Sequence, residues 1–255
     1  ILEKLTPTSK YPQALILTPT RELTIQVANE LYELKGSKEL RITPIYGGQS
    51  YDKQNKQLRK DNDIIVGTPG RLIDHLKAGR LDLSQIQYIV LDEADEMLTS
   101  GFIEDIELIL SKTNPNRKTL LFSATMPDQI LRLSKKYMQN TTTVKAKKET
   151  LATKLTEQIY FEVRESDKLE ALCRIIDVEA QFYGLIFCRT KRDVDTVTEK
   201  LINRGYDAEA MHGDLNQFQR ERVLNKFRKQ LCTILVVTDV ASRGLDINDL
   251  SHVIN

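Results

Sequence analysis

The sequence has little of what marks a membrane protein or a disulfide-bonded protein. No apolar run approaches the length of a membrane span, and Ile1–Leu5 is too polar for the apolar core of a signal peptide. Only three cysteines occur, Cys173, Cys188 and Cys232, and they lie among apolar neighbours without the spacing of metal ligands. We therefore expect a cytoplasmic protein with reduced core thiols and no membrane partner.

The sequence also lacks a net charge of any size, because 36 Asp and Glu residues balance its 37 Lys and Arg residues. A formal charge of +1 creates little long-range field, so any nucleic-acid partner must meet a local basic face. What the sequence does have is apolar content. Its 255 residues, 40% of them hydrophobic, can fill the cores of one large or two ordinary domains.

Short apolar stretches alternate with helical stretches along the chain, which predicts parallel α/β sheets flanked by helices. In the first half, the predicted strands are Ala14–Thr18, Ile42–Tyr46, Asp63–Val66, Tyr88–Leu91 and Thr119–Phe122, and the helices include Arg21–Lys35, Pro69–Lys77 and Pro127–Met138. In the second half, the predicted strands are Gln158–Val163, Gly184–Cys188, Ala208–Met211 and Thr233–Val237, and the helices are Lys168–Ile176, Arg192–Asn203 and Gln217–Lys229.

The stretch Asn140–Thr156 is rich in Thr, Lys and Ala and has little helical periodicity. We place the linker near Lys147–Lys154. This predicts a first domain over 1–148, a linker over 149–156 and a second domain over 157–255.

Asp92 and Glu93 follow the apolar run Tyr88–Leu91 at the point where a buried strand should end. Ligands of open parallel sheets bind beyond the carboxyl ends of strands, so both carboxylates stand where a Mg²⁺-bound phosphate can be reached. One acid can hold the metal through water while the other orients or deprotonates an attacking water. The alternative is that these acids open a helix and favour its dipole, which is the preferred interpretation for an isolated Asp-Glu pair.

Three loops of the first half have residues suited to phosphate groups. Thr20 can cap a helix whose first amides and Arg21 would face an anion. Gly47-Gly48 lets backbone amides approach a sugar-phosphate chain, and Thr68-Pro69-Gly70-Arg71 repeats the pattern of strand, loop and helix start. Each loop alone is an ordinary cap or turn, but three at neighbouring strand ends can follow successive phosphates.

Ser123-Ala124-Thr125 emerges at a strand end on the same predicted edge as Asp95, so a hydrogen-bonded bridge between the two loops is geometrically reasonable. The alternative is that Thr125 caps the helix that follows. In the second half, polar groups again follow strands, at Thr190, at His212-Gly213-Asp214 and after Thr238. His212 has only Asp214 nearby as a second ligand, so we interpret it as a residue that hydrogen-bonds a turn.

Taken together, these motifs resemble the DEAD-box RNA helicases in order and context over essentially the whole chain. In the first half, the resemblance rests on Pro19-Thr20-Arg21-Glu22-Leu23, Gly47-Gly48, Thr68-Pro69-Gly70-Arg71, Asp92-Glu93-Ala94-Asp95 and Ser123-Ala124-Thr125. In the second half, it rests on Phe187 to Thr190, His212-Gly213-Asp214 with Gln217 and Arg220, and Thr238 to Ile247. The resemblance implies two tandem RecA-like domains and ATP-dependent separation of short RNA duplexes.

The resemblance also implies a role for each matching residue. Asp92 and Glu93 would serve a water-bound Mg²⁺ and the attacking water, and Asp95, Ser123 and Thr125 would couple ATP hydrolysis to strand separation. Asp246 and Arg243 would reach the nucleotide. The residues implied to hold the RNA backbone are Pro19, Thr20, Arg21, Gly47, Gly48, Thr68, Pro69, Gly70, Arg71, Thr190, Gly213, Gln217, Arg220 and Thr238. Binding would be tolerant of sequence, sensitive to salt and selective for RNA.

Two features of the family are missing from these residues. None of the eleven glycines belongs to Gly-x-x-x-x-Gly-Lys-Ser/Thr, and no arginine-rich motif follows the last strands. We therefore expect a fragment, truncated in both domains, that has no useful ATPase activity by itself. The other classes of function are a non-catalytic RNA-binding scaffold, a DNA-directed translocase of the same superfamily and, more distantly, a small-molecule α/β enzyme.

Overall fold

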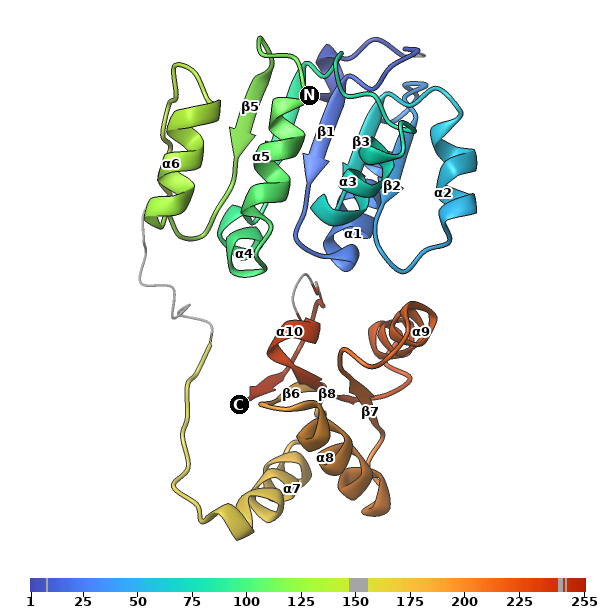
Figure 1. Cartoon of the computed structure of the whole chain (residues 1–255). Helices are drawn as coiled ribbons and strands as arrows, with labels where there is room; N and C mark the ends of the chain where they lie inside the picture. Colours follow the sequence, from blue (N-terminus) through green and yellow to red (C-terminus); the bar gives the residue numbers. More distant parts are fainter. Residues whose placement is uncertain (8, 147–155, 243–244, 246) are drawn as a thin grey trace. The chain divides into compact units, whose positions relative to one another are not determined.

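The structure is a computed structural model that describes residues 1–7, 9–146, 156–242, 245 and 247–255. The chain divides into two compact units, Ile1–Thr141 and Thr142–Asn255, each with its own sheet (Figure 1). Within the described residues, no helix combines the length and the apolar character that crossing a bilayer requires.

The described residues of the first unit form a five-stranded sheet in which every pairing is parallel. Its strands are β1 (Ala14–Leu17), β2 (Ile42–Ile45), β3 (Ile64–Gly67), β4 (Tyr88–Leu91) and β5 (Lys118–Leu121), in the spatial order β2-β3-β1-β4-β5. Leu17 pairs with both Gly67 and Leu91, and their neighbours continue the same register, so the carboxyl ends of all five strands are level.

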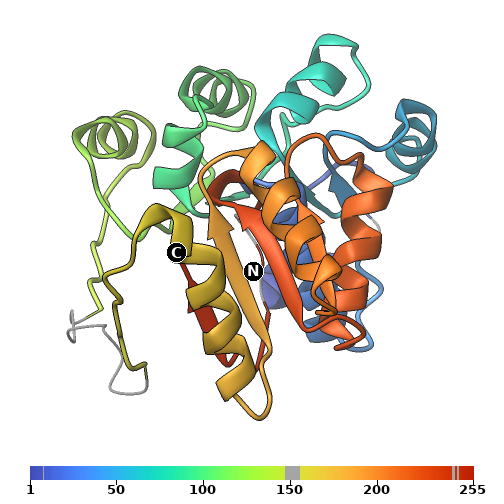
Figure 2. The same cartoon turned by 90° about the horizontal axis from the view of Figure 1, so that it is seen from below.

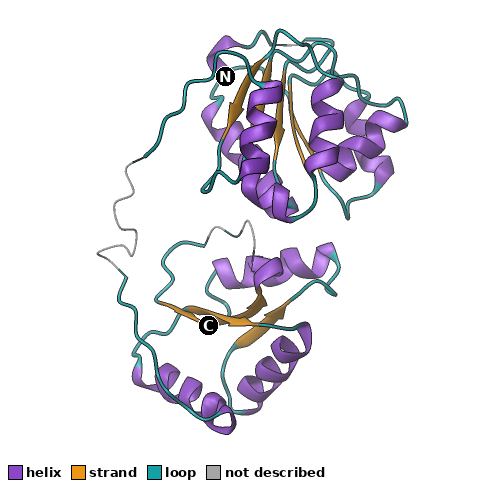
Figure 3. Cartoon of the chain, turned by 60° about the vertical axis from the view of Figure 1, so that its left-hand side comes forward, coloured by secondary structure: helices purple, strands orange, loops and turns teal. Residues whose placement is uncertain are grey.

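Helices cover both faces of this sheet (Figure 3). The helices are α1 (Arg21–Leu34), α2 (Tyr51–Leu58), α3 (Pro69–Lys77), α4 (Ala94–Thr99), α5 (Ile103–Ser111) and α6 (Asp128–Tyr137), after a short 3₁₀ turn at Leu2–Lys4. Side chains alternate along β1, so that Leu15 and Leu17 pack with α3 to α6 while Ala14 and Ile16 pack with α1. Burial on both faces explains why these strands are continuous apolar runs.

The second unit repeats this plan with four described strands, all paired in parallel. Its elements are η2 (Glu165–Asp167), α7 (Lys168–Val178), β6 (Gly184–Cys188), α8 (Lys191–Asn203), β7 (Ala208–Met211), α9 (Gln217–Arg228), β8 (Ile234–Thr238), α10 (Asp239–Ser242) and β9 (His252–Ile254), and the strand order is β7-β8-β6-β9. Helices α7 and α8 pack on one face (Figure 2), and α9 packs on the other.

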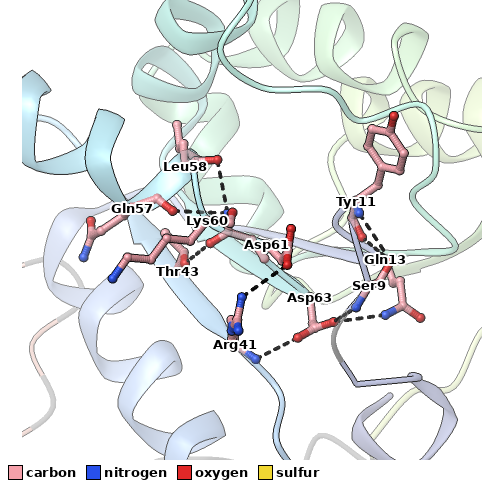
Figure 4. A network of polar contacts seen from close by, with 11 residues as sticks. Ser9, Tyr11, Gln13, Arg41, Thr43, Gln57, Leu58, Lys60, Asp61 and Asp63 are labelled. Carbon is pink, nitrogen blue, oxygen red and sulfur yellow. Dashed lines mark hydrogen bonds and ion pairs between the residues drawn. The ribbon is translucent and has the colours of Figure 1, made fainter.

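A polar network holds the amino-terminal side of the first sheet (Figure 4). The Asp63 side chain is completely buried, and it accepts hydrogen bonds from the backbone N–H groups of Ser9 (3.0 Å) and Arg41 (2.9 Å) and from the Gln13 amide (3.4 Å). These bonds tie the chain before β1 and the chain before β2 to the start of β3.

The predicted fold class, two parallel α/β sheets flanked by helices, is confirmed. The predicted strand Gln158–Val163 is wrong, because those residues belong to no helix or strand. Their apolar side chains are exposed, for example Tyr160 at 84%, and within the described part of the chain they have no neighbouring strand. The predicted linker, 149–156, lies outside the described residues except for Thr156.

Candidate functional site

The level strand ends of the first sheet bring together loops that are far apart in the sequence. In Figure 1 the arrowheads of β1 and β5 point toward the edge from which α1 and α4 start. β1 runs at the centre, with β2 and β3 on one side and β4 and β5 on the other, so the chain changes direction across the sheet beside β1. The crevice at such a switch point is where open α/β sheets bind ligands.

Asp92 and Glu93 form a turn at this switch point. The backbone N–H of Asp92 donates to the Leu17 carbonyl at 3.0 Å, which anchors the turn to β1, and the Asp92 carboxylate accepts from the Glu93 N–H at 3.0 Å. Glu93 has φ 50° and ψ 53°, a left-handed conformation that costs about 1 kcal/mol or more for a residue other than glycine. Glu93 occupies the N-cap position of α4, so these acids do open a helix, but the Glu93 side chain makes no hydrogen bond to the helix start.

Both carboxyl groups of this turn are partly buried, and burial raises their pKa values. The pKa of Glu93 is raised further by the negative charges of Asp92, Glu96 and Asp95. Two adjacent carboxylates that repel each other favour a nearby divalent cation. Within the described residues, no group of three or more His, Cys, Asp or Glu side chains is arranged to hold a metal ion. Carboxylate oxygens are ligands that Mg²⁺ accepts, and water and phosphate oxygens commonly complete its coordination.

Asp95 connects this turn to the loop after β5. Its carboxylate accepts hydrogen bonds from the Thr125 backbone N–H (2.9 Å) and hydroxyl (2.7 Å), and the Asp95 N–H donates to the Ser123 hydroxyl oxygen (3.1 Å). Burial favours a higher pKa for Asp95, but the hydrogen bonds from Thr125 and Ser123 outweigh it and lower the pKa. The alternative prediction that Thr125 caps the following helix is wrong, because α6 starts at Asp128 and Pro127 occupies its cap position.

The loops after β1 and β2 meet at Arg21. Thr20 caps α1 by accepting from the Leu23 N–H at 3.2 Å, and Pro19 lies buried between β1 and this cap. A Cβ atom added to Gly47 would lie 3.3 Å from an Arg21 guanidinium nitrogen, a close contact that the Arg21 side chain would have to relieve. Gly48 is exposed and has φ +84°, a conformation that glycine adopts without strain.

The loop after β3 is more enclosed. Thr68 and Pro69 are buried, and the Thr68 N–H donates to the Ile45 carbonyl at 3.0 Å. Gly70 lies in the first turn of α3. The Arg71 side chain is only 9% exposed, and its guanidinium donates to the Gln49 carbonyl and to the Gln54 side chain, each at 3.0 Å.

In the second unit, the residues that the sequence assigned to the RNA backbone also follow strand ends that are level, since Cys188 pairs with Thr238 and Met211 pairs with Val237. Thr190 is exposed and forms a capping box with Asp193 at the start of α8. The exposed Gly213 lies close to Lys191, which is paired with Asp214.

The remaining residues of this set lie near α9 and α10. Gln217 is the first residue of α9, and Arg220 donates to the Ala241 carbonyl at 3.2 Å. Thr238 is buried and accepts from the Ala241 N–H at 3.3 Å. Arg243 and Asp246 lie outside the described residues.

His212 is buried, with its Nε2 atom 2.9 Å from a carboxylate oxygen of Asp195 and its Nδ1 atom accepting from the Asp214 N–H at 3.4 Å. It therefore joins the turn after β7 to α8.

Two buried polar residues that the sequence patterns did not indicate, Gln54 and His75, contact each other beside Arg71. They stand 21 positions apart, and α2, which contains Gln54, was not among the predicted helices. The available signal was weak, because α2 is polar over most of its length and nothing in its sequence marks Gln54 as its buried residue.

Comparison with known families adds an independent observation. A model described as DEAD/DEAH box helicase matches residues 1–133, and a model described as helicase conserved C-terminal domain matches residues 167–255.

Two curated relatives match most or all of the chain. It is 49% identical over 255 residues to the DEAD-box ATP-dependent RNA helicase CshA of Geobacillus kaustophilus, covering 100% of this chain and 55% of that protein. It is 51% identical over 243 residues to a probable ATP-dependent RNA helicase of Methanocaldococcus jannaschii, covering 95% of this chain and 65% of that protein. The chain thus spans between about half and two thirds of the length of these curated relatives.

Solved structures also match. A DEAD box protein from the hyperthermophile Methanococcus jannaschii matches with a TM-score of 0.56 and 49% identity, covering 99% of this chain and 68% of that chain. Dbp5 of S. cerevisiae, bound to RNA and ADP BeF3, matches with a TM-score of 0.88 and 28% identity, covering 100% of this chain and 64% of that chain.

Proposed function

Because this chain belongs to the DEAD/DEAH box helicase family, we propose that its protein is an ATP-dependent RNA helicase that separates short RNA duplexes locally. The observation that carries this proposal is the turn of Asp92 and Glu93, two partly buried carboxylates at the switch point of the sheet, joined through Asp95 to Ser123 and Thr125. A non-catalytic scaffold has no need of two such carboxylates with raised pKa values.

In this proposal each carboxylate has its own task. Asp92 would hold a Mg²⁺ ion through water, and that ion would neutralise charge on the phosphates of ATP. Glu93 would accept the proton of the attacking water, and its raised pKa makes it a better proton acceptor than an ordinary glutamate. Asp95, Ser123 and Thr125 would transmit the state of this turn to the loop after β5. Arg243 and Asp246 remain proposed nucleotide contacts.

RNA would be held by its backbone at the strand ends of both units. The exposed residues Gly48, Thr190 and Gly213 and the cationic Arg21 are the best placed for phosphate or ribose contacts. The buried residues Thr68, Pro69 and Thr238 would act through the backbone of their loops. Few base edges would be read, so binding would tolerate different sequences. The relatives named ATP-dependent RNA helicases and the RNA-bound Dbp5 support this choice of partner.

We also propose a cytoplasmic location. Cys173, Cys188 and Cys232 all have free thiols, and burial raises the pKa of both Cys188 and Cys232 to about 11. Unpaired, unreactive thiols are typical of proteins in a reducing compartment.

The proposal is tested by ATP hydrolysis in the full-length protein, with single-stranded RNA or DNA of the same sequence. We expect RNA to stimulate hydrolysis more than DNA, and Glu93→Gln to slow it by about 10²-fold or more while RNA affinity stays within about twofold. We also expect the wild-type rate to fall on acidification through an apparent pKa above 4.5, the ordinary value for glutamate, because only the ionised form accepts the proton.

Two results would overturn the proposal. Equal stimulation by DNA would favour a DNA-directed translocase, and unchanged hydrolysis in Glu93→Gln would remove the proposed role of the acidic turn.

A further inference from the structure

The guanidinium of Arg71 is occupied by contacts inside the first unit. One of its terminal nitrogens donates to the Gln49 carbonyl and to Gln54 Oε1, each at 3.0 Å. Its plane lies against the Tyr51 ring, with Cζ 4.0 Å from the ring centroid, and its Nε is 3.8 Å from an Asp74 carboxylate oxygen. With 9% of the side chain exposed, little of Arg71 is available to an external phosphate.

Gln54 is the acceptor around which this arrangement is built. Its side chain is completely buried, and its amide nitrogen donates to the Tyr46 carbonyl at 2.8 Å. A carbonyl can only accept, so the NH₂ group must face Tyr46 and Oε1 must face Arg71. The orientation of the Gln54 amide is therefore set by the β2–α2 loop.

His75 completes the arrangement from the opposite side. It is completely buried, and its Nε2 atom lies 2.9 Å from the same Gln54 Oε1. Because that oxygen is an acceptor, Nε2 carries the proton in the neutral ring. The Nδ1 atom is buried and has no hydrogen-bond partner among the described residues, so a second proton there would be unsatisfied. In agreement, burial and then the positive charges of Arg71 and Arg80 lower the pKa of His75.

These contacts join the two loops that the proposed function assigns to the RNA backbone. Gln49 directly follows the Gly47-Gly48 turn, and Arg71 directly follows Gly70 at the start of α3. The guanidinium thus spans from the first turn of α3 to the loop after β2, and Gln54 and His75 hold it there from α2 and α3. A change in this network would move one loop relative to the other.

We propose that Arg71, Gln54 and His75 are positioning residues, which hold the Gly47-Gly48 turn and the start of α3 at a fixed separation so that backbone N–H groups of both loops meet successive RNA phosphates. This inference rests on the proposed RNA binding, and it replaces the direct phosphate contact that the sequence suggested for Arg71. A preformed pair of loops lowers the ordering cost of binding an extended backbone.

The dependence of RNA affinity on salt separates positioning from direct contact. Each phosphate neutralised by a side chain adds about 0.7 to the slope of log K against log salt for a single strand. We would measure binding of a fluorescent single-stranded RNA to the full-length protein by anisotropy at several salt concentrations. For Gln54→Met and for Arg71→Met we expect about tenfold weaker binding with the salt slope unchanged, because the hydrogen bond between Arg71 and Gln54 that holds the two loops is lost.

Three further variants complete the test. Arg71→Lys keeps the charge but cannot bridge Gln49 and Gln54, so we expect it to bind as weakly as Arg71→Met. The double variant Gln54→Met/Arg71→Met should bind no more weakly than either single variant, because both changes remove the same hydrogen bond between Arg71 and Gln54. Arg59→Met, at an exposed position just after α2, controls for the loss of one charge and should stay within about twofold of wild type.

The outcomes distinguish this inference from the proposed function. If Arg71→Met lowers the slope by about 0.7 and Arg71→Lys binds normally, Arg71 contacts a phosphate directly and the inference is wrong. Normal binding by Gln54→Met would also overturn it. If the wild-type protein does not bind RNA, or if Arg21→Met leaves both affinity and slope unchanged, it is the proposed function that fails. Thermal unfolding shows whether each variant is folded at the assay temperature. If Gln54→Met is not folded there, the binding of Arg71→Lys decides between positioning and direct phosphate contact.

Discussion

At the scale of single residues, buried polar side chains set the positions of the loops in the first unit. Asp63 does so at the amino-terminal side of the sheet, where its carboxylate accepts from the backbone N–H groups of Ser9 and Arg41 (Figure 4). Gln54 does so near the carboxyl ends, between Tyr46 and Arg71. Each is completely buried, so each hydrogen bond that is lost leaves a group that water cannot satisfy.

We expect Asp63→Ala to destabilise the first unit by about 2–4 kcal/mol, because two backbone N–H groups would lose their acceptor and a fully buried side chain would be removed. Urea unfolding followed by circular dichroism measures this change. Asp61→Ala is the matched control. Asp61 is 52% exposed and its pair with Arg41 is at the surface, so its loss should cost less than about 1 kcal/mol. Equal effects of the two variants would contradict the role assigned to Asp63.

The sequence predicted the acidic turn but not the orientation of the residues around it. Asp92 and Glu93 could be found because they end an apolar run, which is a local pattern. The enclosure of Arg71 could not, because it depends on Gln54, 17 positions away, whose amide is oriented by Tyr46 in the loop after β2. Side-chain contacts of this kind follow from packing between elements rather than from neighbours in the chain.

At the scale of helices and strands, hydrogen-bonded caps mark where several helices begin. Thr190 caps α8 by accepting from the Asp193 N–H, while the Asp193 side chain accepts from the Thr190 N–H. Asn216 and Gln219 form the same reciprocal arrangement at α9. Both helices start at the carboxyl edge of the second sheet, so their caps also set the positions of the loops there.

We expect Thr190→Ala to destabilise the second unit by about 1 kcal/mol, the usual cost of removing a capping hydroxyl. Thr196→Ala, at an exposed position inside the same helix, should be neutral or slightly stabilising because alanine favours helix more than threonine does. Thermal unfolding of the two variants gives the comparison. A loss in Thr196→Ala as large as that in Thr190→Ala would show that the cap is not the cause.

Capped helices and apolar strands were predicted most closely. Thr20 and Pro69 give local signals for a helix start, so the starts of α1 and α3 were predicted correctly. The predicted end of α3 also agrees with the structure, whereas the predicted end of α1 is one residue late. The segment Gln158–Val163 shows where such signals fail. Its apolar, aromatic and β-branched residues are typical of a strand, but a strand also needs a hydrogen-bonded neighbour, and composition does not specify one.

At the scale of the whole molecule, the near balance of charge limits how the proposed RNA partner can be recognised. The formal net charge of +1 gives little long-range attraction, so binding depends on contacts made at short range. We therefore expect association with single-stranded RNA at about 10⁵–10⁷ M⁻¹s⁻¹, without electrostatic acceleration at low salt. Stopped-flow fluorescence with a protein of these 255 residues, to which the net charge belongs, measures this rate constant. A value above about 10⁸ M⁻¹s⁻¹ that falls steeply with salt would show that a local basic surface steers RNA despite the balanced total.

The protected thiols have a practical consequence for spectroscopy. Cys173 and Cys232 are buried, and a pKa of about 11 at Cys188 and Cys232 leaves about one thiolate in ten thousand at neutral pH. Maleimide reagents react with the thiolate, so the native cysteines should be modified slowly. A cysteine introduced at an exposed helical position, such as Thr196→Cys, could then receive a fluorophore in the otherwise unaltered protein.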